Sequence, residues 1–332
     1  MTPVRWGVLS AGRIATNKVI PGMLKSHMLT VSGIAARDLS RAQLAASRLG
    51  IEEVYGSYEA MLADPEIEAI YNPLPNHLHV PMTLAAVRAG KHVLCEKPMA
   101  LRASELDVLR PYADRVHIWE AFMVRFHPQW IDAREQIRRG AIGDLRFMQV
   151  GFSYFNDDPS DIRNRADIGG GATYDIGCYA VFAGRRFFDS NPQRAIATMD
   201  RDSAFGTDRC TSGLLDFAGG RQLAFSVSTQ AARYQRVLLA GTRGRIEIEI
   251  PFNAPQDGAC RYGLDDCSSL DGSSTRFTVL PVAGQYQLQA EAFSHAVRHQ
   301  QPSEAALDDA QWNIRTIEAL FSSAQTGRFE VV

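Results

Sequence analysis

The chain has 332 residues, of which 45% are hydrophobic and 22% are charged, a balance typical of globular proteins. The net charge is −2 and no basic cluster stands out, so the composition argues against a nucleic-acid partner. No apolar run approaches the length of a membrane span, and the opening MTPVRWGVLS lacks the layout of a signal peptide. Because this length exceeds the usual size of one hydrophobic core, we expect two domains.

The five cysteines are scattered along the chain, at positions 95, 178, 210, 260 and 267. Their number is odd and none are spaced as a metal-binding pair, so reduced thiols in the cytoplasm are the simplest account. We see no cluster of metal-ligating residues and expect no metal.

Short apolar segments alternate with helical patterns through the first part of the chain. The expected strands are residues 5–9, 29–35, 53–55, 69–72, 92–95 and 116–120, and the expected helices are residues 14–26, 41–49, 57–63, 79–89 and 103–113. This alternation predicts a parallel sheet with helices on both faces. We assign residues 1–121 to this α/β domain.

The pattern changes after residue 121. A helix over residues 128–139 ends at Gly140, and a second helix is expected at 172–188. The expected strands are residues 145–155, 195–201, 211–217, 222–229, 235–240, 245–250 and 276–280, and the tail is helical at residues 287–299 and 306–324. Residues 122–332 are therefore expected to form an α+β domain with a mostly antiparallel sheet, whose C-terminal helix could pack back on the first domain.

The turn after the first expected strand is similar to a dinucleotide-binding fingerprint. The segment SAGRIA, from Ser10 to Ala15, stands where such a fingerprint has G-x-G-x-x-G/A, but only Gly12 and the terminal small residue match. Small residues let a backbone approach a pyrophosphate, and the N-terminus of the next helix favours an anion. Ser10, Gly12, Arg13 and Ile14 are therefore candidate cofactor-binding residues, and the alternative is an ordinary α/β turn.

The end of the second expected strand bears on the choice of cofactor. An acidic residue there would bind the adenosine ribose and select NAD. The chain instead has Arg37 and Arg41, which suit a 2′-phosphate, while Asp38 lies past the strand tip and could cap the next helix. We therefore expect NADP rather than NAD; the alternative is that both arginines are solvated surface residues.

A loop bracketed by prolines follows the fourth expected strand. Its sequence, NPLPNHLH, stands at the carboxyl end of a strand, where α/β proteins bind ligands. Pro75, Asn76 and His79 are the candidate cofactor contacts in this loop. Asn76 could equally cap the next helix.

The fifth expected strand ends in Glu96-Lys97-Pro98, at the same edge of the sheet. Pro98 donates no backbone hydrogen bond and restricts the backbone of Lys97, so the chain holds a lysine still at a strand end. The alternative is a surface turn with ordinary charges.

A glycine-rich segment, residues 169–179, leads into a helix on which Asp175 and Tyr179 share one face. A free phenol titrates near a pKa of ~10, and a nearby ammonium lowers that pKa. A lysine, a carboxylate and a phenol together suit alcohol–carbonyl chemistry. Pairs of Asp and Tyr at this spacing are, however, commonly structural.

Together these residues resemble the glucose–fructose oxidoreductase/inositol dehydrogenase family, Gfo/Idh/MocA, over nearly the whole chain. The most specific matches are Glu96-Lys97-Pro98 and the segment 169–179, and the segments PNHLH, EAFMVRFHP and GDL support them. The resemblance implies an N-terminal Rossmann domain and a C-terminal α+β domain whose open sheet commonly forms the oligomer interface. We therefore expect a homodimer or a higher homo-oligomer. Tyr179, where many relatives have histidine, is similar to the branch of glucose–fructose oxidoreductase, xylose dehydrogenase and dimeric dihydrodiol dehydrogenase.

The resemblance implies an NADP-dependent oxidoreductase that transfers hydride to or from C1 of a pyranose aldose, giving a lactone from the sugar. Lys97 would contact the nicotinamide ribose and the substrate hydroxyl, Tyr179 would remove the hydroxyl proton, and Asp175 would orient the sugar or Lys97. Glu96 is expected either to contact the nicotinamide side or to pair locally. Candidates for the wall of the sugar site are Arg125, Tyr154, Phe155 and Arg165, although packing is the commoner role for each.

Several other functions fit the same motifs. The enzymatic alternatives are reduction of a keto-sugar such as an anhydrofructose, oxidation of a trans-dihydrodiol, and an aldose oxidoreductase that retains its nicotinamide between turnovers. The non-enzymatic alternative is a nucleotide-sensing binding protein. The presence of both Lys97 and Tyr179 argues against this last alternative.

Overall fold

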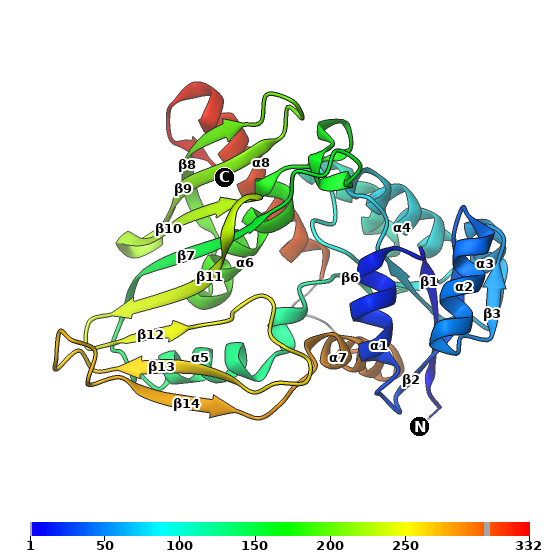
Figure 1. The fold of residues 1–332 in the computed structure, drawn as a ribbon, viewed down its shortest axis with the longest axis horizontal. Coiled ribbons are helices and arrows are strands. Elements are labelled where there is room, and N and C mark those ends of the chain that lie inside the picture. The colour runs from blue at the N-terminus through cyan, green and yellow to red at the C-terminus, as the bar shows by residue number, and fades with distance from the viewer. Residues whose placement is uncertain (1, 302–305) are drawn as a thin grey trace. The chain divides into compact units, whose positions relative to one another are not determined.

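The structure, a computed structural model, describes residues 2–301 and 306–332. Its internal contacts divide the chain into two units (Figure 1). The first unit comprises Met1–Met123 and Gly284–Gln311, and the second comprises Val124–Ala283 and Trp312–Val332. The expected second domain, residues 122–332, differs from this division mainly in Gly284–Gln311, which groups with the first unit.

The first unit is built on a six-stranded parallel sheet with the order β3-β2-β1-β4-β5-β6. Its strands are β1 (Val4–Leu9), β2 (Leu29–Ala35), β3 (Glu53–Tyr55), β4 (Ala69–Asn72), β5 (His92–Cys95) and β6 (Ile118–Glu120), and its helices are α1 (Ile20–Met23), α2 (Leu39–Leu49), α3 (Tyr58–Ala63), α4 (His79–Arg88) and α7 (Gln285–His299). The predicted parallel sheet is confirmed. Residues 103–113 differ in type, because Ala103–Tyr112 forms a 3₁₀ helix with Pro111 inside it.

The strand order of the first sheet reverses between β1 and β4. Such a switch point leaves a crevice beyond the carboxyl ends of the two strands, which is where α/β proteins bind nucleotides. In this chain Ser10 follows β1 and Pro73 follows β4. The topology therefore brings the turn and the loop singled out in the sequence to the same edge.

Helix α7 is part of the core of the first unit. The rings of Trp6 and Phe293 have centroids 5.0 Å apart, and both side chains are fully buried. The ring of Trp119 lies 5.0 Å from Phe293 on another side, and the Trp6 indole N–H donates to Ser294 Oγ at 3.1 Å. Burying one such aromatic ring contributes about 2–3 kcal/mol. A segment distant in sequence therefore completes the hydrophobic core of the nucleotide-binding unit.

The second unit is built on a nine-stranded sheet with the order β14-β13-β12-β11-β7-β10-β9-β8-β15. Its strands are β7 (Leu145–Phe155), β8 (Pro192–Arg201), β9 (Asp208–Phe217), β10 (Arg221–Ser228), β11 (Gln230–Gly241), β12 (Arg245–Ile248), β13 (Cys260–Asp265), β14 (Arg276–Leu280) and β15 (Glu330–Val331). Its helices are α5 (Pro128–Arg138), α6 (Cys178–Phe188) and the part of α8 (Leu307–Thr326) that follows Gln311. The sheet is antiparallel except that β10 pairs with β7 in parallel, so the predicted mostly antiparallel sheet is confirmed.

Two strands of this sheet are absent from the sequence prediction, β13 and β15. In β13 the pattern is interrupted by Gly263, where a Cβ would come 2.7 Å from Thr275 Cγ2. Glycine is therefore required because the segment with Thr275 approaches closely, although glycine weakens the strand signal in the sequence. The strand β15 spans only Glu330–Val331, which is too short to show a pattern.

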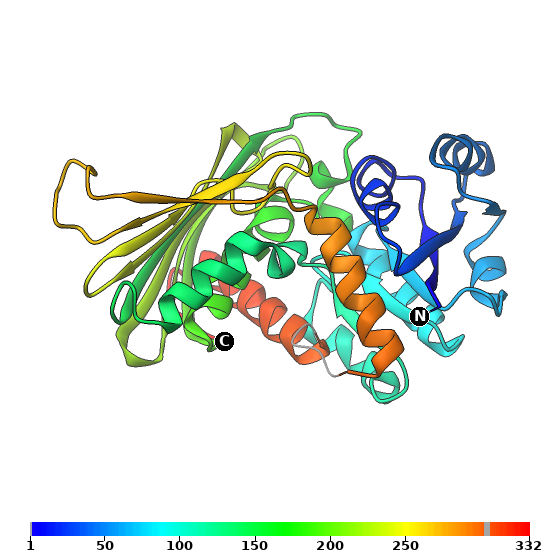
Figure 2. The same ribbon diagram turned by 90° about the horizontal axis from the view of Figure 1, so that it is seen from below.

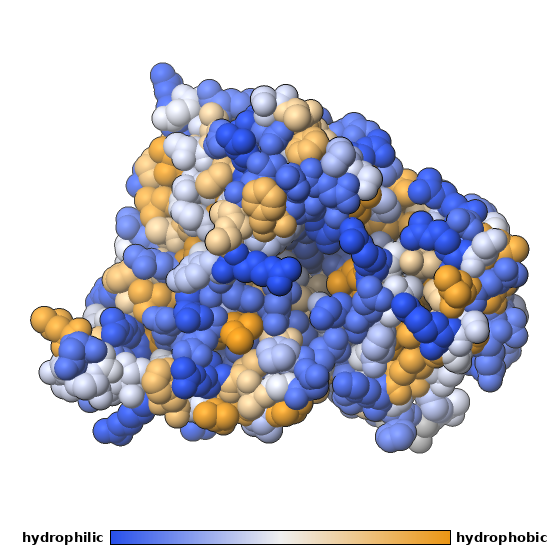
Figure 3. All heavy atoms as spheres, viewed as in Figure 1, coloured by the Kyte–Doolittle hydropathy of each residue, from blue (hydrophilic) through white to orange (hydrophobic). Residues whose placement is uncertain are grey.

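The helices of the second unit lie on one face of its sheet. Figure 2 shows α5, α6 and α8 on this face, and in the described part of the chain no helix covers the other face. The uncovered face carries large apolar side chains, among them Phe147, Tyr234, Phe277 and Val279, each 44–66% exposed. Figure 3 shows hydrophobic and hydrophilic residues interspersed over this face. Within residues 2–301 and 306–332, no helix has the length and apolar character that a membrane span requires.

Candidate active site

The turn after β1 places a serine where a fingerprint has its first glycine. Ser10 has a φ of 152°, in a region that side-chain-bearing residues rarely adopt. Its Oγ accepts a hydrogen bond from the backbone N–H of Gly12 at 2.9 Å. A Cβ on Gly12 would lie 3.1 Å from that Oγ, which is tighter than ordinary contact. The serine therefore preserves the tight, small-residue turn that a pyrophosphate requires, so this turn fits a bound dinucleotide.

The helical segment that follows this turn starts at Ala15. Thr16 N–H donates to Gly12 O at 3.0 Å, which joins the turn to the helical segment Ala15–Val19. Arg13 is exposed and Ile14 is half-buried. The four predicted residues of the turn thus lie together at the carboxyl end of β1.

The end of β2 carries two exposed arginines and a capping aspartate. Asp38 is the N-cap of α2 and its side chain accepts from Arg41 N–H at 3.1 Å, so the predicted cap is confirmed. Arg37 and Arg41 both have exposed side chains. The cap uses the backbone N–H of Arg41. The groups that would bind an anion here are therefore the guanidinium groups of Arg37 and Arg41.

The loop after β4 is organised by His79, which is only 1% exposed. The two imidazole nitrogens lie 2.7 Å from Pro98 O and 2.6 Å from Leu74 O. Burial lowers the pKa of His79 to about 4, against the opposing effect of these two carbonyl acceptors. The imidazole is therefore engaged by the backbone of its own unit, and its role in the structure is to join two loops.

The remaining predicted residues of this loop are less buried. Pro75 and Asn76 are both half-buried. Pro75 is the N-cap of the 3₁₀ turn Asn76–Leu78, and Leu78, without a side-chain hydrogen bond, is the N-cap of α4. The alternative that Asn76 caps the next helix is therefore wrong.

The turn that presents Lys97 is fixed by hydrogen bonds from neighbouring strands. The Lys97–Pro98 peptide is cis. Glu96 N–H donates to Asn72 O at 3.0 Å, and Tyr71 Oη donates to Glu96 Oε1 at 2.7 Å. The carboxylate of Glu96 is thus engaged within the first unit, and its contact with the nicotinamide side stays a prediction.

The other side of this turn is equally constrained. Met99 N–H donates to Oε1 of Glu120, a residue of β6 that is 2% exposed. His79 Nδ1 lies at Pro98 O, as described above. Lys97 itself is half-buried between these anchored residues. The backbone that carries the lysine is thus held on both sides, and a group held in this way is suited to bind a substrate without reorganisation.

The second unit carries Asp175 and Tyr179. Asp175 lies in the helical turn Thr173–Gly177, which continues into α6, and α6 carries Tyr179. Tyr179 is 5% exposed, and its ring packs against Phe152 and Phe252 with centroid distances of 5.9 and 5.2 Å. Asp175 Oδ2 accepts from Tyr154 Oη at 2.5 Å and lies 3.3 Å from Arg163 Nε.

A glycine before this helix is required by a close approach within the second unit. Gly171 has a φ of +115°, and a Cβ there would come 2.0 Å from Asp208 Oδ1. Asp208 Oδ2 in turn accepts from the N–H and the Oγ1 of Thr173, at 2.7 and 2.6 Å. Burial raises the pKa of Asp208, although these hydrogen bonds act against the rise. A buried carboxylate from β9 therefore fixes the start of the helix that carries Asp175 and Tyr179.

The four predicted residues of the sugar wall have different surroundings. Tyr154 contacts Asp175, whereas Phe155 is 63% exposed and Arg165 forms an exposed pair with Asp167 at 2.6 Å. Arg125 is 6% exposed and its guanidinium lies 5.0 Å from the ring centroid of Phe182. The structure thus brings Tyr154 to Asp175.

Sequence reasoning selected Arg165 and missed Arg163, the arginine that pairs with Asp175. The two arginines lie in the same irregular loop, where no periodicity tells which one points inward. Lys97 belongs to the first unit, and Asp175 and Tyr179 belong to the second. No group of three or more potential metal ligands is found among the described residues.

Family models match both parts of the chain. Residues 4–118 match the oxidoreductase family with an NAD-binding Rossmann fold, and residues 130–247 match the GFO/IDH/MocA C-terminal domain. The first match agrees with the strand order of the first sheet, and the second covers the helix with Asp175 and Tyr179.

Similar proteins cover the whole chain. An uncharacterized oxidoreductase of Rhizobium meliloti is 46% identical over 100% of both chains. A D-xylose 1-dehydrogenase (NADP(+)) of Haloferax volcanii is 36% identical over 97% of this chain and 98% of its own. Among solved structures, a 3-ketoreductase from Actinomadura kijaniata in complex with NADP and TDP-benzene is 26% identical, with a TM-score of 0.90 over 97% of this chain and 98% of that chain.

Proposed function

This chain belongs to the Gfo/Idh/MocA oxidoreductase family, and we propose that it is an NADP-dependent sugar dehydrogenase acting at C1 of a pyranose aldose. The observation that carries the proposal is the 36% identity to a D-xylose 1-dehydrogenase (NADP(+)) over nearly the full length of both chains. The lysine, carboxylate and phenol expected for such chemistry are present as Lys97, Asp175 and Tyr179.

When bound, the nicotinamide supplies the hydride acceptor or donor. Lys97 holds the substrate hydroxyl, and its ammonium lowers the pKa of the phenol of Tyr179, which removes the hydroxyl proton. Asp175 orients the sugar or Lys97. Tyr154 is unsuited to be the base, because burial and the carboxylate of Asp175 raise its pKa and keep it a phenol.

NADP is favoured by the arginines at the end of β2. Arg37 and Arg41 are exposed at the place where the adenosine ribose is expected, and Asp38 is engaged as a helix cap. A 2′-phosphate there would find two guanidinium groups, with the side chain of Asp38 engaged by the helix cap. Ser10, Gly12, Arg13 and Ile14 would line the pyrophosphate, with Pro75, Asn76, Glu96 and Lys97 at the neighbouring strand ends.

The test is a panel of aldoses, polyols and dihydrodiols with NADP⁺ and with NAD⁺, in which the appearance of reduced nicotinamide is followed. Lys97→Ala and Tyr179→Phe should each lower kcat at least ~100-fold, because general acid–base catalysis contributes about 10²–10⁴-fold. NADP⁺ binding should persist in both variants. Full activity in Tyr179→Phe would refute the assignment of the base.

The cofactor assignment has a separate test. Arg37→Ala should reduce the preference for NADP⁺ over NAD⁺ by ~10-fold or more, since a charged hydrogen bond to phosphate contributes about 1.5–3 kcal/mol. An unchanged preference would contradict the 2′-phosphate site. Nicotinamide absorbance in the purified protein would show that the cofactor is retained between turnovers.

A second candidate function is the reduction of a keto-sugar with NADPH. It is favoured by the full-length structural similarity to a 3-ketoreductase, with a TM-score of 0.90. The two functions use the same side chains in opposite directions. Consumption of NADPH with a keto-sugar, and no oxidation of any aldose, would select reduction.

A homodimer through the open face of the second sheet completes the proposal. This face combines exposed apolar side chains such as Phe147 and Tyr234 with small residues such as Ala224. The ring of Tyr234 lies over Gly151, where a Cβ would come 2.7 Å from it. An exposed apolar area of this kind is typical of an interface between copies. Phe147→Asp should convert the dimer to a monomer in analytical ultracentrifugation, and a monomeric wild-type protein would contradict it.

A further inference from the structure

We propose that Tyr154 and Arg163 are positioning residues that hold the carboxylate of Asp175 in one orientation for the reaction. We call these two residues the Asp175 clamp. The inference rests on the proposed function in one respect only, namely that Asp175 takes part in turnover. The clamp itself is a feature of the second unit alone.

The clamp is formed by side chains from three separate segments. Tyr154 lies near the end of β7, Arg163 lies in the 3₁₀ turn Ile162–Asn164, and Asp175 lies in the first turn of the helix that continues into α6. Both donors meet the same oxygen, since Asp175 Oδ2 is 2.5 Å from Tyr154 Oη and 3.3 Å from Arg163 Nε. Two donors on one oxygen hold that oxygen more firmly than either donor would alone.

Arg163 is itself held in place before it reaches Asp175. Asp161 Oδ1 accepts from the backbone N–H of Arg163 at 3.0 Å and lies 3.3 Å from its Nη1. Gly171 N–H donates to Arg163 O at 2.8 Å. A Cβ on Gly170 would come 2.5 Å from that same carbonyl oxygen, so only glycine lets the two segments approach. The glycine-rich segment thus has a second purpose, which is to seat the arginine of the clamp.

The charges of this cluster favour a phenol and an ionised carboxylate. The carboxylate of Asp175 raises the pKa of Arg163, and burial together with Asp175 raises the pKa of Tyr154. Tyr154 therefore stays protonated and donates, while the guanidinium favours the charged form of Asp175. Asp161 is a further charged group beside this cluster, and it pairs with Arg163 at 3.3 Å. Removal of either donor should make Asp175 easier to protonate and free its side chain to rotate.

The experiment compares Tyr154→Phe and Arg163→Gln with the wild-type protein in the full chain. The titration of Asp175 is followed by NMR of ¹³C-labelled aspartate carboxyl groups, assigned with Asp175→Asn. Loss of the paired cation in Arg163→Gln should raise the pKa of Asp175 by about 1–3 units, with a smaller rise in Tyr154→Phe. Arg163→Lys keeps the charge, so the pKa of Asp175 should stay close to its wild-type value. The matched control is Arg165→Gln, from the same loop, because Arg165 pairs with Asp167 and should leave the pKa of Asp175 unchanged.

The same variants are then assayed with the aldose that gives the highest turnover. We expect kcat to fall about 10–100-fold with a smaller change in KM, as for the displacement of a catalytic group by about 1 Å. The acid limb of the pH profile should move upward with the pKa of Asp175. An unchanged pKa of Asp175 in Arg163→Gln that folds like the wild type would overturn the clamp. If the wild type oxidises no aldose, the proposed function fails, and the titration still decides the clamp.

Discussion

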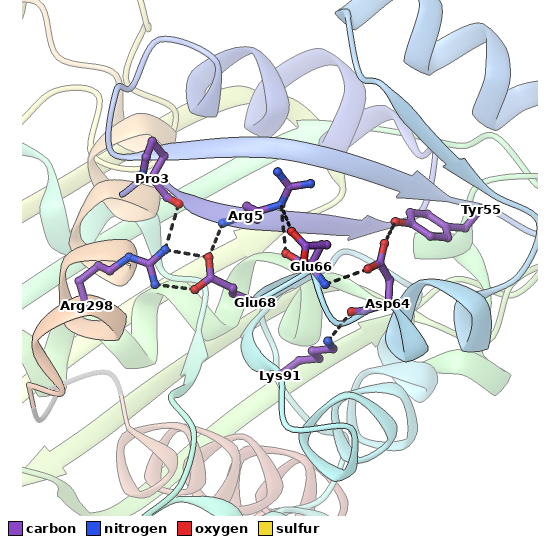
Figure 4. A network of polar contacts seen from close by, with 8 residues as sticks. All are labelled: Pro3, Arg5, Tyr55, Asp64, Glu66, Glu68, Lys91 and Arg298. Atoms are coloured by element: carbon purple, nitrogen blue, oxygen red, sulfur yellow. Dashed lines mark hydrogen bonds and ion pairs between the residues drawn. The ribbon is translucent and has the colours of Figure 1, made fainter. Parts of the chain in front are cut away.

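Arg298 joins α7 to the first sheet, and we predict that Arg298→Ala destabilises the first unit. Figure 4 shows the guanidinium bound to both oxygens of Glu68, at 2.5 and 2.7 Å. Arg298 also donates to the carbonyl oxygens of Thr2 and Pro3, each at 2.9 Å. Glu68 in addition accepts from the backbone N–H of Arg5 at 3.0 Å. One side chain near the end of α7 thus connects the first strand, β4 and the returning helix.

The magnitude follows from the geometry and the partial burial of the pair. Side-chain exposure is 21% for Arg298 and 33% for Glu68, so the pair is neither fully buried nor fully solvated. Exposed ion pairs contribute about 0–1 kcal/mol, and breaking a buried pair costs about 3–5 kcal/mol. We therefore expect Arg298→Ala to lower the free energy of unfolding by ~2 kcal/mol, between these two limits.

The dependence on pH gives a second measure of the same interaction. The hydrogen bond from Arg298 is the main cause that lowers the pKa of Glu68 below its usual 4.5. A carboxylate with a lowered pKa contributes stability above its unfolded-state pKa and loses it as the pH falls through the folded-state value. The difference between wild type and Arg298→Ala should therefore be largest near neutral pH and shrink as the pH falls below 4.5.

The assay is urea unfolding followed by tryptophan fluorescence, with Trp6 and Trp119 in the first unit as reporters. The control is Arg146→Ala, because Arg146 pairs with Asp144 at 3.3 Å and both side chains are exposed, at 57% and 80%. That variant should lose less than ~1 kcal/mol. A loss in Arg298→Ala no greater than in the control, or one independent of pH, would refute the reasoning.

Two further predictions concern Gly171 and His79. Gly171→Ala should unfold the start of the helix that carries Asp175 and Tyr179 in a thermal melt, since its Cβ would lie 2.0 Å from Asp208. Gly50→Ala, at a φ of +68° with open space around it, should lose only ~1 kcal/mol. Equal melting temperatures for the two variants would contradict this. Because burial lowers the pKa of His79 from 6.5 to about 4, the unfolded chain binds more protons in this range, so stability should fall as the pH drops from 6.5 to 4. In His79→Gln, the free energy of unfolding measured in urea should lose about 3 kcal/mol of this pH dependence. An unaltered pH dependence would count against a neutral buried imidazole.

Much of the fold could be predicted from local patterns. The segments 29–35, 53–55, 69–72, 92–95, 145–155 and 276–280 are strands with the predicted bounds. Hydrophobic periodicity and turn residues are local properties, and they survive folding because each strand must bury at least one face. The cap formed by Asp38 is local in the same sense, since donor and acceptor are three residues apart.

Contacts between distant segments could not be predicted in this way. The parallel pairing of β10 with β7, and the burial of Phe293 against Trp6, join residues far apart in sequence. Propensity and periodicity carry no information on such pairings, because they describe the chain one segment at a time. The strand β13 was missed for a related reason. Gly263 is required by the close approach of a neighbouring segment, and it interrupts the strand pattern of its own segment.

In the candidate site, too, some features follow from local sequence and others from contacts between distant segments. The residue types can be read from the chain: a lysine before a proline at a strand end, and Asp175 one helical turn before Tyr179. Their surroundings depend on folding, which buries His79 against two carbonyl oxygens, binds Glu96 to Tyr71, and puts Arg163 rather than Arg165 at Asp175. The physical reason is that the direction of a side chain in an irregular loop depends on which distant backbone lies against that loop, and no repeat in the sequence records it.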